Sequence, residues 1–458
     1  MSELPHGWSL VTVDQVTACE RYALAIGPFG SSLKVSDYRS YGVPLVFVRN
    51  IRASAFGPND LRYVSREKAE SLLPHQVSQG DLLITKMGNP PGDATIYPLT
   101  QPGIVTADCI KMTPHPSIDA RYLLHAFATR DVARQINAIT QGVAQRKVSL
   151  ERFRKGVKIP LAPRVEQQRI TAVVEEQFSR LDAGVAALER ARQNLKRMRA
   201  AALDGLLRAD DGTDFPLVEL GEILTHGRYG TSTKCSADGA GLPVLRIPNV
   251  QSGKIDLSDL KYAIDSSLDL TGSRVSEGDV LIIRTNGSRS LIGRAAVVPQ
   301  IQNSTAFASY LIQLRMDPNA INPSYLAAVL AAPCLRTRLE DLAATTAGQY
   351  NISLGKLRSL RVPLPTLTEQ SNALSSAEGQ LSIADHIDGE VGRSLSRSNL
   401  LRSSILDRAF GGGLVPQDLT EEPASVLLAR IAAERASSNG NGAVRGRWSR
   451  VVREEVTS

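Results

Sequence analysis

The sequence predicts an α+β protein built as a tandem duplication. Two mixed α/β domains are joined by two long helices that form an antiparallel coiled coil, giving a pseudo-twofold molecule. Three observations predict this fold class. They are an internal repeat of about 200 residues, short β-rich runs that alternate with turn signals, and two long proline-free stretches with heptad spacing.

The internal repeat is carried by blocks that recur in the same order. GVPLVFVRNI at 42–51 returns as GLPVLRIPNV at 241–250, and GDLLI at 80–84 returns as GDVLI at 278–282. Isolated dipeptides recur by chance, but ordered blocks do not. The spacing is too long for a solenoid, so each copy is a domain-sized unit. We expect the mixed domains at 1–162 and 211–365.

Each mixed domain is expected to hold strands and helices in the same order. Runs rich in β-branched residues at 43–51, 81–85, 244–247 and 280–283 predict strands. A helical stretch is predicted near 119–137, and its counterpart near 322–342. Pro333 should interrupt the second helix, because proline lacks the N–H that a helix interior needs.

The two long helices are predicted at 163–210 and 366–412. The second is the poorer helix former, because Gly379, Gly389 and Gly392 lie inside it. An ordinary bundle helix packed on its own domain is the alternative for each. The heptad-spaced apolar residues expected in the helix contacts are Ile170, Val174, Leu181, Leu188, Leu195, Leu374, Leu381, Val391, Leu395 and Ile405.

The C-terminal tail is predicted to span 413–458 and to be partly flexible. It follows three consecutive glycines, which stop the preceding helix. A short amphipathic helix is expected at 424–434. The stretch 437–446 is rich in Gly, Asn and Ser and is expected to be flexible.

Composition restricts the class of protein. No run approaches the roughly 18 apolar residues of a membrane span, and no secretory signal opens the chain. The four cysteines lie far apart, which predicts a cytoplasmic protein without disulfides and without a metal site. The net charge of +7 favours a polyanionic partner.

Catalytic motifs are missing from the sequence. It contains no P-loop and no paired-carboxylate nuclease pattern. Asn89-Pro90-Pro91-Gly92 nearly matches the Asn-Pro-Pro-aromatic motif of adenine amino-methyltransferases, but Gly92 stands where the stacking ring belongs. A turn after the strand at 81–85 is the better interpretation, and we expect no catalytic residue and no cofactor on this chain.

Polar side chains recur at equivalent loops of both copies. Arg, Lys, Asn and Gln are the side chains that read base edges, and Arg and Lys also contact phosphates. Any one of them alone is better explained as a solvated surface residue. As a set, they predict DNA binding by Lys34, Arg49, Asn50, Lys86, Asn89, Gln145, Arg146, Lys147, Lys234, Arg246, Asn249, Arg284, Asn286, Arg289, Gln349, Tyr350 and Asn351.

Together with the duplication, several motifs resemble the specificity subunits of type I restriction-modification systems. The resemblance covers about residues 4 to 435. It is carried by GPFGSSLK at 27–34, GDLLITKMGNPPG at 80–92, IPLAP at 159–163 with Glu166-Gln167, VPLP at 362–365 with Glu369-Gln370, and LRSSILDRAFGGGLVPQD at 401–418.

The resemblance implies two target recognition domains, each reading one half of a bipartite site on double-stranded DNA. It implies that the helices set the gap between the halves and dock two modification subunits, which methylate adenine N6 with S-adenosylmethionine. Two restriction (motor-nuclease) subunits, using ATP and Mg²⁺, are expected to join them. The chain itself would catalyse nothing and bind no membrane.

Two other functions remain possible from the residues alone. One is a self-contained adenine DNA methyltransferase that uses Asn89-Pro90-Pro91, which the missing aromatic residue and missing cofactor loop disfavour. The other is a coiled-coil adaptor without sequence readout, which the paired polar loops disfavour.

Overall fold

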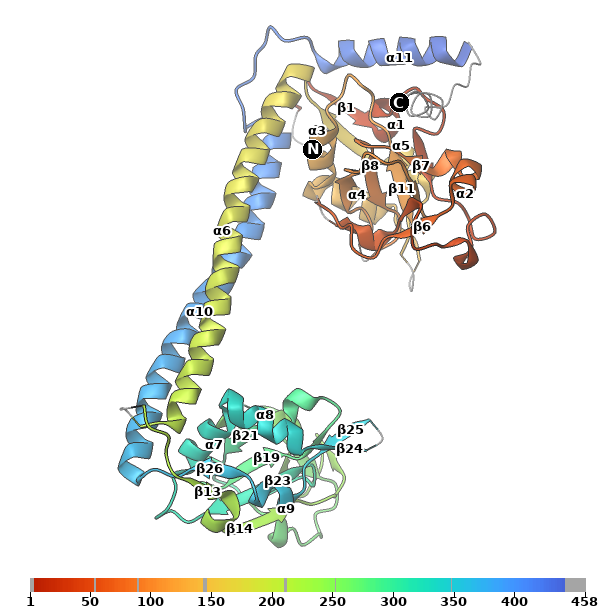
Figure 1. Ribbon diagram of the computed structural model, residues 1–458. Coiled ribbons are helices and arrows are strands. Elements are labelled where there is room, and N and C mark those ends of the chain that lie inside the picture. The colour runs from red at the N-terminus through yellow and green to blue at the C-terminus, as the bar shows by residue number, and fades with distance from the viewer. Residues whose placement is uncertain are drawn as a thin grey trace. The chain divides into compact units, whose positions relative to one another are not determined.

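The computed structural model describes residues 4–440 except 53–54, 89, 143–145, 210–211, 252 and 347. The chain forms two compact units (Figure 1). Unit 1 combines residues 1–186 with 395–458, and unit 2 is residues 187–394. Among the described helices, none has the length and apolar character needed to cross a membrane.

Unit 1 is built on two four-stranded sheets. Buried strands such as β8 carry side chains into the core on both faces, which explains their continuous apolar sequences. The first sheet is antiparallel and has the order β2 (Leu24–Ile26), β11 (Cys109–Met112), β8 (Leu82–Thr85), β9 (Ala94–Ile96). The second has the order β6 (Arg62–Val64), β3 (Val43–Val46), β10 (Gly103–Val105), β7 (Gln76–Val77). A separate pair joins β1 (Ser9–Thr12) to β12 (Lys158–Leu161).

Unit 2 repeats this topology. Its main sheet has the order β14 (Leu224–Tyr229), β23 (Leu311–Met316), β19 (Val280–Ile283), β21 (Ala295–Val297), β17 (Gly253–Lys254). Its second sheet has the order β15 (Cys235–Ser236), β18 (Lys261–Ala263), β16 (Pro243–Leu245), β22 (Ala306–Phe307). The terminal pair is β13 (Leu217–Glu219) with β26 (Arg361–Pro363). The predicted duplication and fold class are therefore confirmed.

The helices of the two units also correspond. In unit 2, Pro333 separates α7 (Pro323–Ala331) from α8 (Pro333–Leu342), as predicted. In unit 1, the predicted single stretch is also two helices, α3 (Ala120–Phe127) and α4 (Arg130–Ala138). No proline causes this break. Thr129 ends one helix by donating its hydroxyl to the Ala126 carbonyl and caps the next by accepting from the Val132 N–H. The shorter helices are α1 (Val13–Val16), α2 (Arg66–Ser71), α5 (Leu150–Gly156) and α9 (Leu354–Arg358).

The two long helices are α6 (Arg164–Asp204) and α10 (Leu367–Phe410). α10 runs unbroken through its three glycines. In unit 2, Arg192 contacts Asp388 at 3.2 Å and Arg199 contacts Asp385 at 2.8 Å, so the two helices run antiparallel. All ten predicted contact residues are at least half-buried; Ile170, Val174, Leu195 and Val391 are fully buried.

The helix contacts follow the internal repeat. In unit 1, Arg402 forms an ion pair with Asp182 and lies 4.6 Å above the Phe178 ring centroid. Arg402 and Asp182 correspond in the repeat to Arg199 and Asp385, which pair in unit 2. The predicted antiparallel pairing of the helices is thus present within each unit.

The C-terminal tail contains α11 (Ala424–Gly440), longer than the predicted helix, and it packs on unit 1 (Figure 1). Ala424, Leu427 and Ile431 are buried in the core of unit 1. Arg435 donates to the carbonyls of Asp14 and Thr17 at 2.9 and 2.8 Å, at the end of α1. The apolar stripe of this helix is therefore part of the unit 1 core.

Replacing Ile431 with alanine should destabilise unit 1 by about 3 kcal/mol, because a fully buried isoleucine leaves a cavity. Denaturant unfolding of the full chain measures the loss. Val426→Ala is the matched control on the same helix, since Val426 is 43% exposed. Equal losses for the two variants would contradict the docking of α11.

Candidate nucleic-acid interface

The topology of unit 1 brings the ends of β2 and β8 and the start of β11 together at one end of its antiparallel sheet. This end, where the strands meet their loops, is called the sheet edge below. β2 and β8 both run antiparallel to β11, so both end where β11 begins. Lys86 directly follows β8. Its N–H donates to the Asp108 carbonyl at 2.8 Å, and its own carbonyl accepts from the Val148 N–H at 3.1 Å. The loop that carries Lys147 therefore lies against the end of β8.

Unit 2 builds the same edge from β14, β19 and β23. Arg284 directly follows β19; its N–H donates to the Tyr310 carbonyl at 2.9 Å, and its carbonyl accepts from the Ile352 N–H at 2.9 Å. Here the loops form a small sheet of β20 (Thr285–Asn286), β25 (Gln349–Asn351) and β24 (Ala344–Thr346). Figure 1 labels β24 and β25. The loops that sequence reasoning paired thus lie together in both units.

The basic side chains at the two edges are held in the same way. The Lys86 ammonium donates to the Ala107 carbonyl at 3.2 Å and lies 5.5 Å from the Phe29 ring centroid. The Arg284 guanidinium donates to the Ser309 carbonyl at 3.4 Å and lies 4.3 Å from the Tyr229 ring centroid. Each edge therefore presents a cation that is fixed by a carbonyl and an aromatic face.

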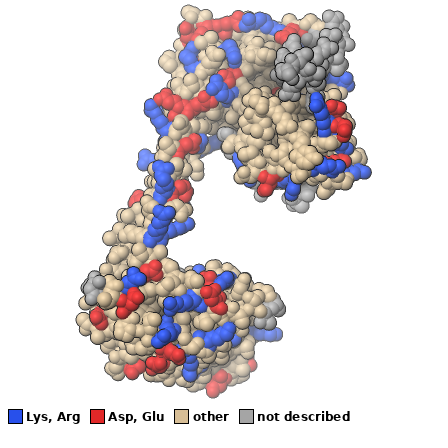
Figure 2. Space-filling view, in the orientation of Figure 1, with Lys and Arg blue, Asp and Glu red and all other residues tan. Residues whose placement is uncertain are grey.

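The other predicted residues differ in whether their side chains are already bonded within the protein. Arg289 is engaged by Glu340 at 3.5 Å and Asp341 at 2.7 Å. Arg146 donates to the Asn137 side chain. Lys34, Lys147, Lys234 and Gln349 are exposed, whereas Asn286, Tyr350 and Asn351 are half-buried. Asn89 and Gln145 lie outside the described residues. Figure 2 shows patches of Lys and Arg on the surface of unit 2.

Two predicted asparagines are placed differently from the expectation. Asn50 and Asn249 are 0% and 1% exposed. Asn50 donates to the Gly57 and Asn59 carbonyls and accepts from the Phe47 N–H. Asn249 makes the equivalent bonds to Asp256, Asp259 and Arg246. Their amides are used up inside their own loops, so they shape the backbone and do not face a base.

The arginines beside those asparagines stabilise the same loops. Arg49 donates to the Asp60 carbonyl at 2.9 Å and stacks 4.2 Å from the Phe47 ring centroid. Arg246 donates to the Asp259 carbonyl and carboxylate, each at 3.2 Å. Both side chains thus close a loop of their own unit.

Three aromatic residues of the edges, Phe29, Tyr229 and Tyr310, were not among the predicted residues. They are 66%, 40% and 55% exposed. Large exposed aromatic side chains are the signal that marks them, because rings of this size are normally buried. Burial is a property of the fold, and the sequence pattern does not report it for single loop residues.

Gly92, the last residue of the Asn-Pro-Pro-Gly motif, bonds back to strand β8. The Gly92 N–H donates to both the carbonyl and the hydroxyl of Thr85, at 3.0 and 2.9 Å. Those bonds are typical of a turn after β8, and they agree with the structural interpretation of this segment.

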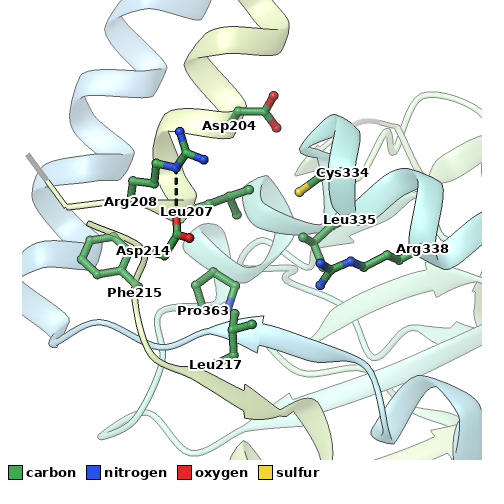
Figure 3. A pocket seen from close by; sticks show the side chains of 10 residues that line it. All are labelled: Asp204, Leu207, Arg208, Asp214, Phe215, Leu217, Cys334, Leu335, Arg338 and Pro363. Atoms are coloured by element: carbon green, nitrogen blue, oxygen red, sulfur yellow. Dashed lines mark hydrogen bonds and ion pairs between the residues drawn. The ribbon is translucent and has the colours of Figure 1, made fainter. Parts of the chain in front are cut away.

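Unit 2 also contains a pocket of about 330 Å³ beside the end of α6 (Figure 3). Leu207, Phe215 and Leu335 form apolar walls, and an ion pair between Arg208 and Asp214 at 2.9 Å lies at its side. Burial, followed by the charge of Asp204, raises the pKa of the Cys334 thiol. The thiol is therefore not activated as a nucleophile.

One group of side chains in unit 1 has metal-ligand chemistry: Cys19, His115 and Glu434. The Ser117 N–H donates to His115 Nδ1 at 3.2 Å, so the ring proton lies on Nε2 and is donated to Glu434 at 3.2 Å. The ring thus links α11 to the rest of unit 1.

Comparisons with known proteins agree with this fold. No family model matches the chain. A solved chain from a study of complex assembly in a type I R-M system matches with a TM-score of 0.69 and 19% identity, covering 90% of this chain and all of its own length. The HsdS subunit from Thermoanaerobacter tengcongensis matches with a TM-score of 0.50 and 18% identity, over 90% of this chain and 98% of its own. These likenesses show the fold.

Sequence relatives agree with the resemblance that the motifs indicated. Along nearly its whole length the chain is similar to specificity subunits of type I restriction enzymes. In particular, it is 28% identical to the EcoKI specificity subunit of Escherichia coli K12, over 97% of this chain and 98% of the relative. It is 27% identical to the StySPI specificity subunit of Salmonella potsdam, over 96% and 97% of the two chains.

Proposed function

We propose that the chain supplies the DNA specificity of a type I restriction-modification complex and catalyses nothing itself. Each unit reads one half of a bipartite site on double-stranded DNA. Modification subunits, which carry S-adenosylmethionine, dock on the chain and methylate adenine N6. Restriction subunits carry ATP and Mg²⁺. No cofactor is assigned to this chain.

One observation carries the proposal: both units present the same sheet edge, but with different side chains. Lys86, Arg146 and Lys147 occupy the edge of unit 1, where Arg284, Tyr350 and Asn351 occupy that of unit 2. Base edges differ in their donor and acceptor patterns, so two chemically different edges on one scaffold suit two different half-sites.

A methylation map of genomic DNA from source cells, with and without this chain, tests the proposal. We expect an asymmetric split motif, with methylated adenine in each half, to disappear when the chain is removed. Restoring the chain should restore the motif. If a methyltransferase co-purifies with the chain and yet the map is unchanged, the chain is an adaptor without sequence readout. If the isolated chain transfers methyl groups, it is an enzyme.

A further inference from the structure

The aromatic residues at the two edges occupy different places in the repeat. Gly27 and Gly230 are equivalent, because equivalent backbone passes close to each. A Cβ at Gly27 would lie 2.0 Å from Thr106 C, and a Cβ at Gly230 would lie 2.1 Å from Phe307 O. Phe29 lies two residues after its glycine, and Tyr229 lies one residue before its own. A ring inherited through the duplication would stand at the same position in both copies.

The arrangement of ring and cation is the same at both edges, even though the two rings stand at different positions in the repeat. Each ring lies beside the cation that follows the equivalent strand, β8 or β19, and each cation bonds to the equivalent carbonyl, that of Ala107 or Ser309. Two sequence solutions to one arrangement indicate that the arrangement itself is needed. A ring beside a basic side chain restricts where the cation points, since the charge favours the face of the ring.

A fixed direction is what base reading needs. A phosphate contact tolerates a mobile lysine, because phosphate oxygens surround one diffuse charge. The major-groove edge of guanine offers two acceptors, O6 and N7, at one defined place. Lys86 donates one of its three N–H groups to the Ala107 carbonyl, and Arg284 donates from Nη1 to the Ser309 carbonyl. Arg284 Nε is buried without a hydrogen-bond partner among the described residues. The remaining Lys86 donors and the remaining Nη donors of Arg284 match an acceptor pair.

The ring of Tyr229 is itself anchored. Its hydroxyl accepts from the Leu354 N–H at 2.8 Å, at the start of α9 and next to the β25 loop. Phe29 has no hydroxyl and stays 66% exposed. The ring, and not the hydroxyl, is therefore the feature that the two edges share.

We propose that Phe29 and Tyr229 are positioning residues that hold Lys86 and Arg284 to read a guanine, one in each half-site. The proposal rests on the function proposed above and deepens it. In each half-site, one cation reads one base pair, and one ring holds that cation in place.

The test uses the full chain in its complex with the modification subunits and compares methylation maps. Phe29→Leu should relax selectivity about fivefold at one G·C pair of one half-site, the same pair that Lys86→Gln relaxes. Phe29→Tyr keeps the ring and should restore selectivity. In the other half, Tyr229→Leu should act on the pair that Arg284→Gln relaxes, and Tyr229→Phe should not. Tyr41→Leu, at an 81% exposed aromatic of unit 1, is the matched control.

Several outcomes would overturn the inference. Phe29→Leu could weaken modification of all sequences equally and make the salt dependence shallower, which would place Lys86 on a phosphate. Lys86→Gln could relax a pair that Phe29→Leu leaves intact, which would remove the role of the ring. The relaxed pair could be A·T, which would contradict the reading of a guanine by the cation. A wild-type complex that methylates no split motif would instead defeat the proposed function itself.

Discussion

Gly27→Ala is expected to destabilise unit 1 by about 3 kcal/mol, and Gly230→Ala should do the same to unit 2. At both positions the added Cβ would lie within about 2 Å of backbone atoms, those of Thr106 and Phe307. The obstructing atoms are backbone atoms at the ends of β10 and β22 and in the residues that follow these strands, so they cannot rotate away as a side chain would. The strand edges that carry Lys86 and Arg284 must shift instead.

Matched controls exist in each unit. A Cβ at Gly30 or at Gly287 would meet no atom within 4 Å. Gly30→Ala and Gly287→Ala should therefore leave the free energy of unfolding nearly unchanged. Denaturant unfolding of the full chain compares the four variants. If Gly27→Ala loses no more stability than Gly30→Ala, the close approach at the edge is not present in solution.

Acidification from pH 7 to pH 4 is expected to destabilise unit 1 through His125 by about 3 kcal/mol. The side chain is 5% exposed, neither ring nitrogen has a hydrogen-bond partner among the described residues, and the ring packs edge-on against Phe178. Burial lowers the pKa of His125 to about 4 in the folded chain, against the smaller raising effect of Asp119.

The sign of the effect follows from proton binding. The pKa in the unfolded chain is about 6.5. Between that value and about 4, the unfolded state binds more protons than the folded state, so stability is full at neutral pH and falls as the pH is lowered. His125→Leu should remove this part of the pH dependence. His386→Leu, at an exposed position of α10, should not. An unchanged slope in the His125 variant would mean that another group is responsible.

The sequence predicted the features that local patterns determine. Ordered repeats such as 42–51 and 241–250 predicted two units of one topology. The main sheets of the two units share the order of four strands, β2-β11-β8-β9 in unit 1 and β14-β23-β19-β21 in unit 2. Heptad spacing predicted α6 and α10, because apolar periodicity is a property of the helix itself. Proline predicted the break between α7 and α8, since its missing N–H acts locally.

Features that depend on distant contacts were not predictable. Asn50 and Asn249 have the residue type of base readers, but the segments at 57–59 and 256–259 fold over them and take their hydrogen bonds. Phe29 and Tyr229 cannot be matched by aligning the two copies, because they stand at different positions. The pattern of α11 predicted an apolar face but not the surface that this face covers.

The discontinuous make-up of unit 1 has a consequence for how the chain is completed during translation. Its core includes Leu406, Phe410 and Ile431 as well as residues from the first part of the chain. Unit 2 is contiguous, and the ribosome delivers all of it before those three side chains emerge. Unit 1 is therefore begun first and completed last. Its apolar surface stays exposed until the segment that carries Leu406, Phe410 and Ile431 has been synthesised.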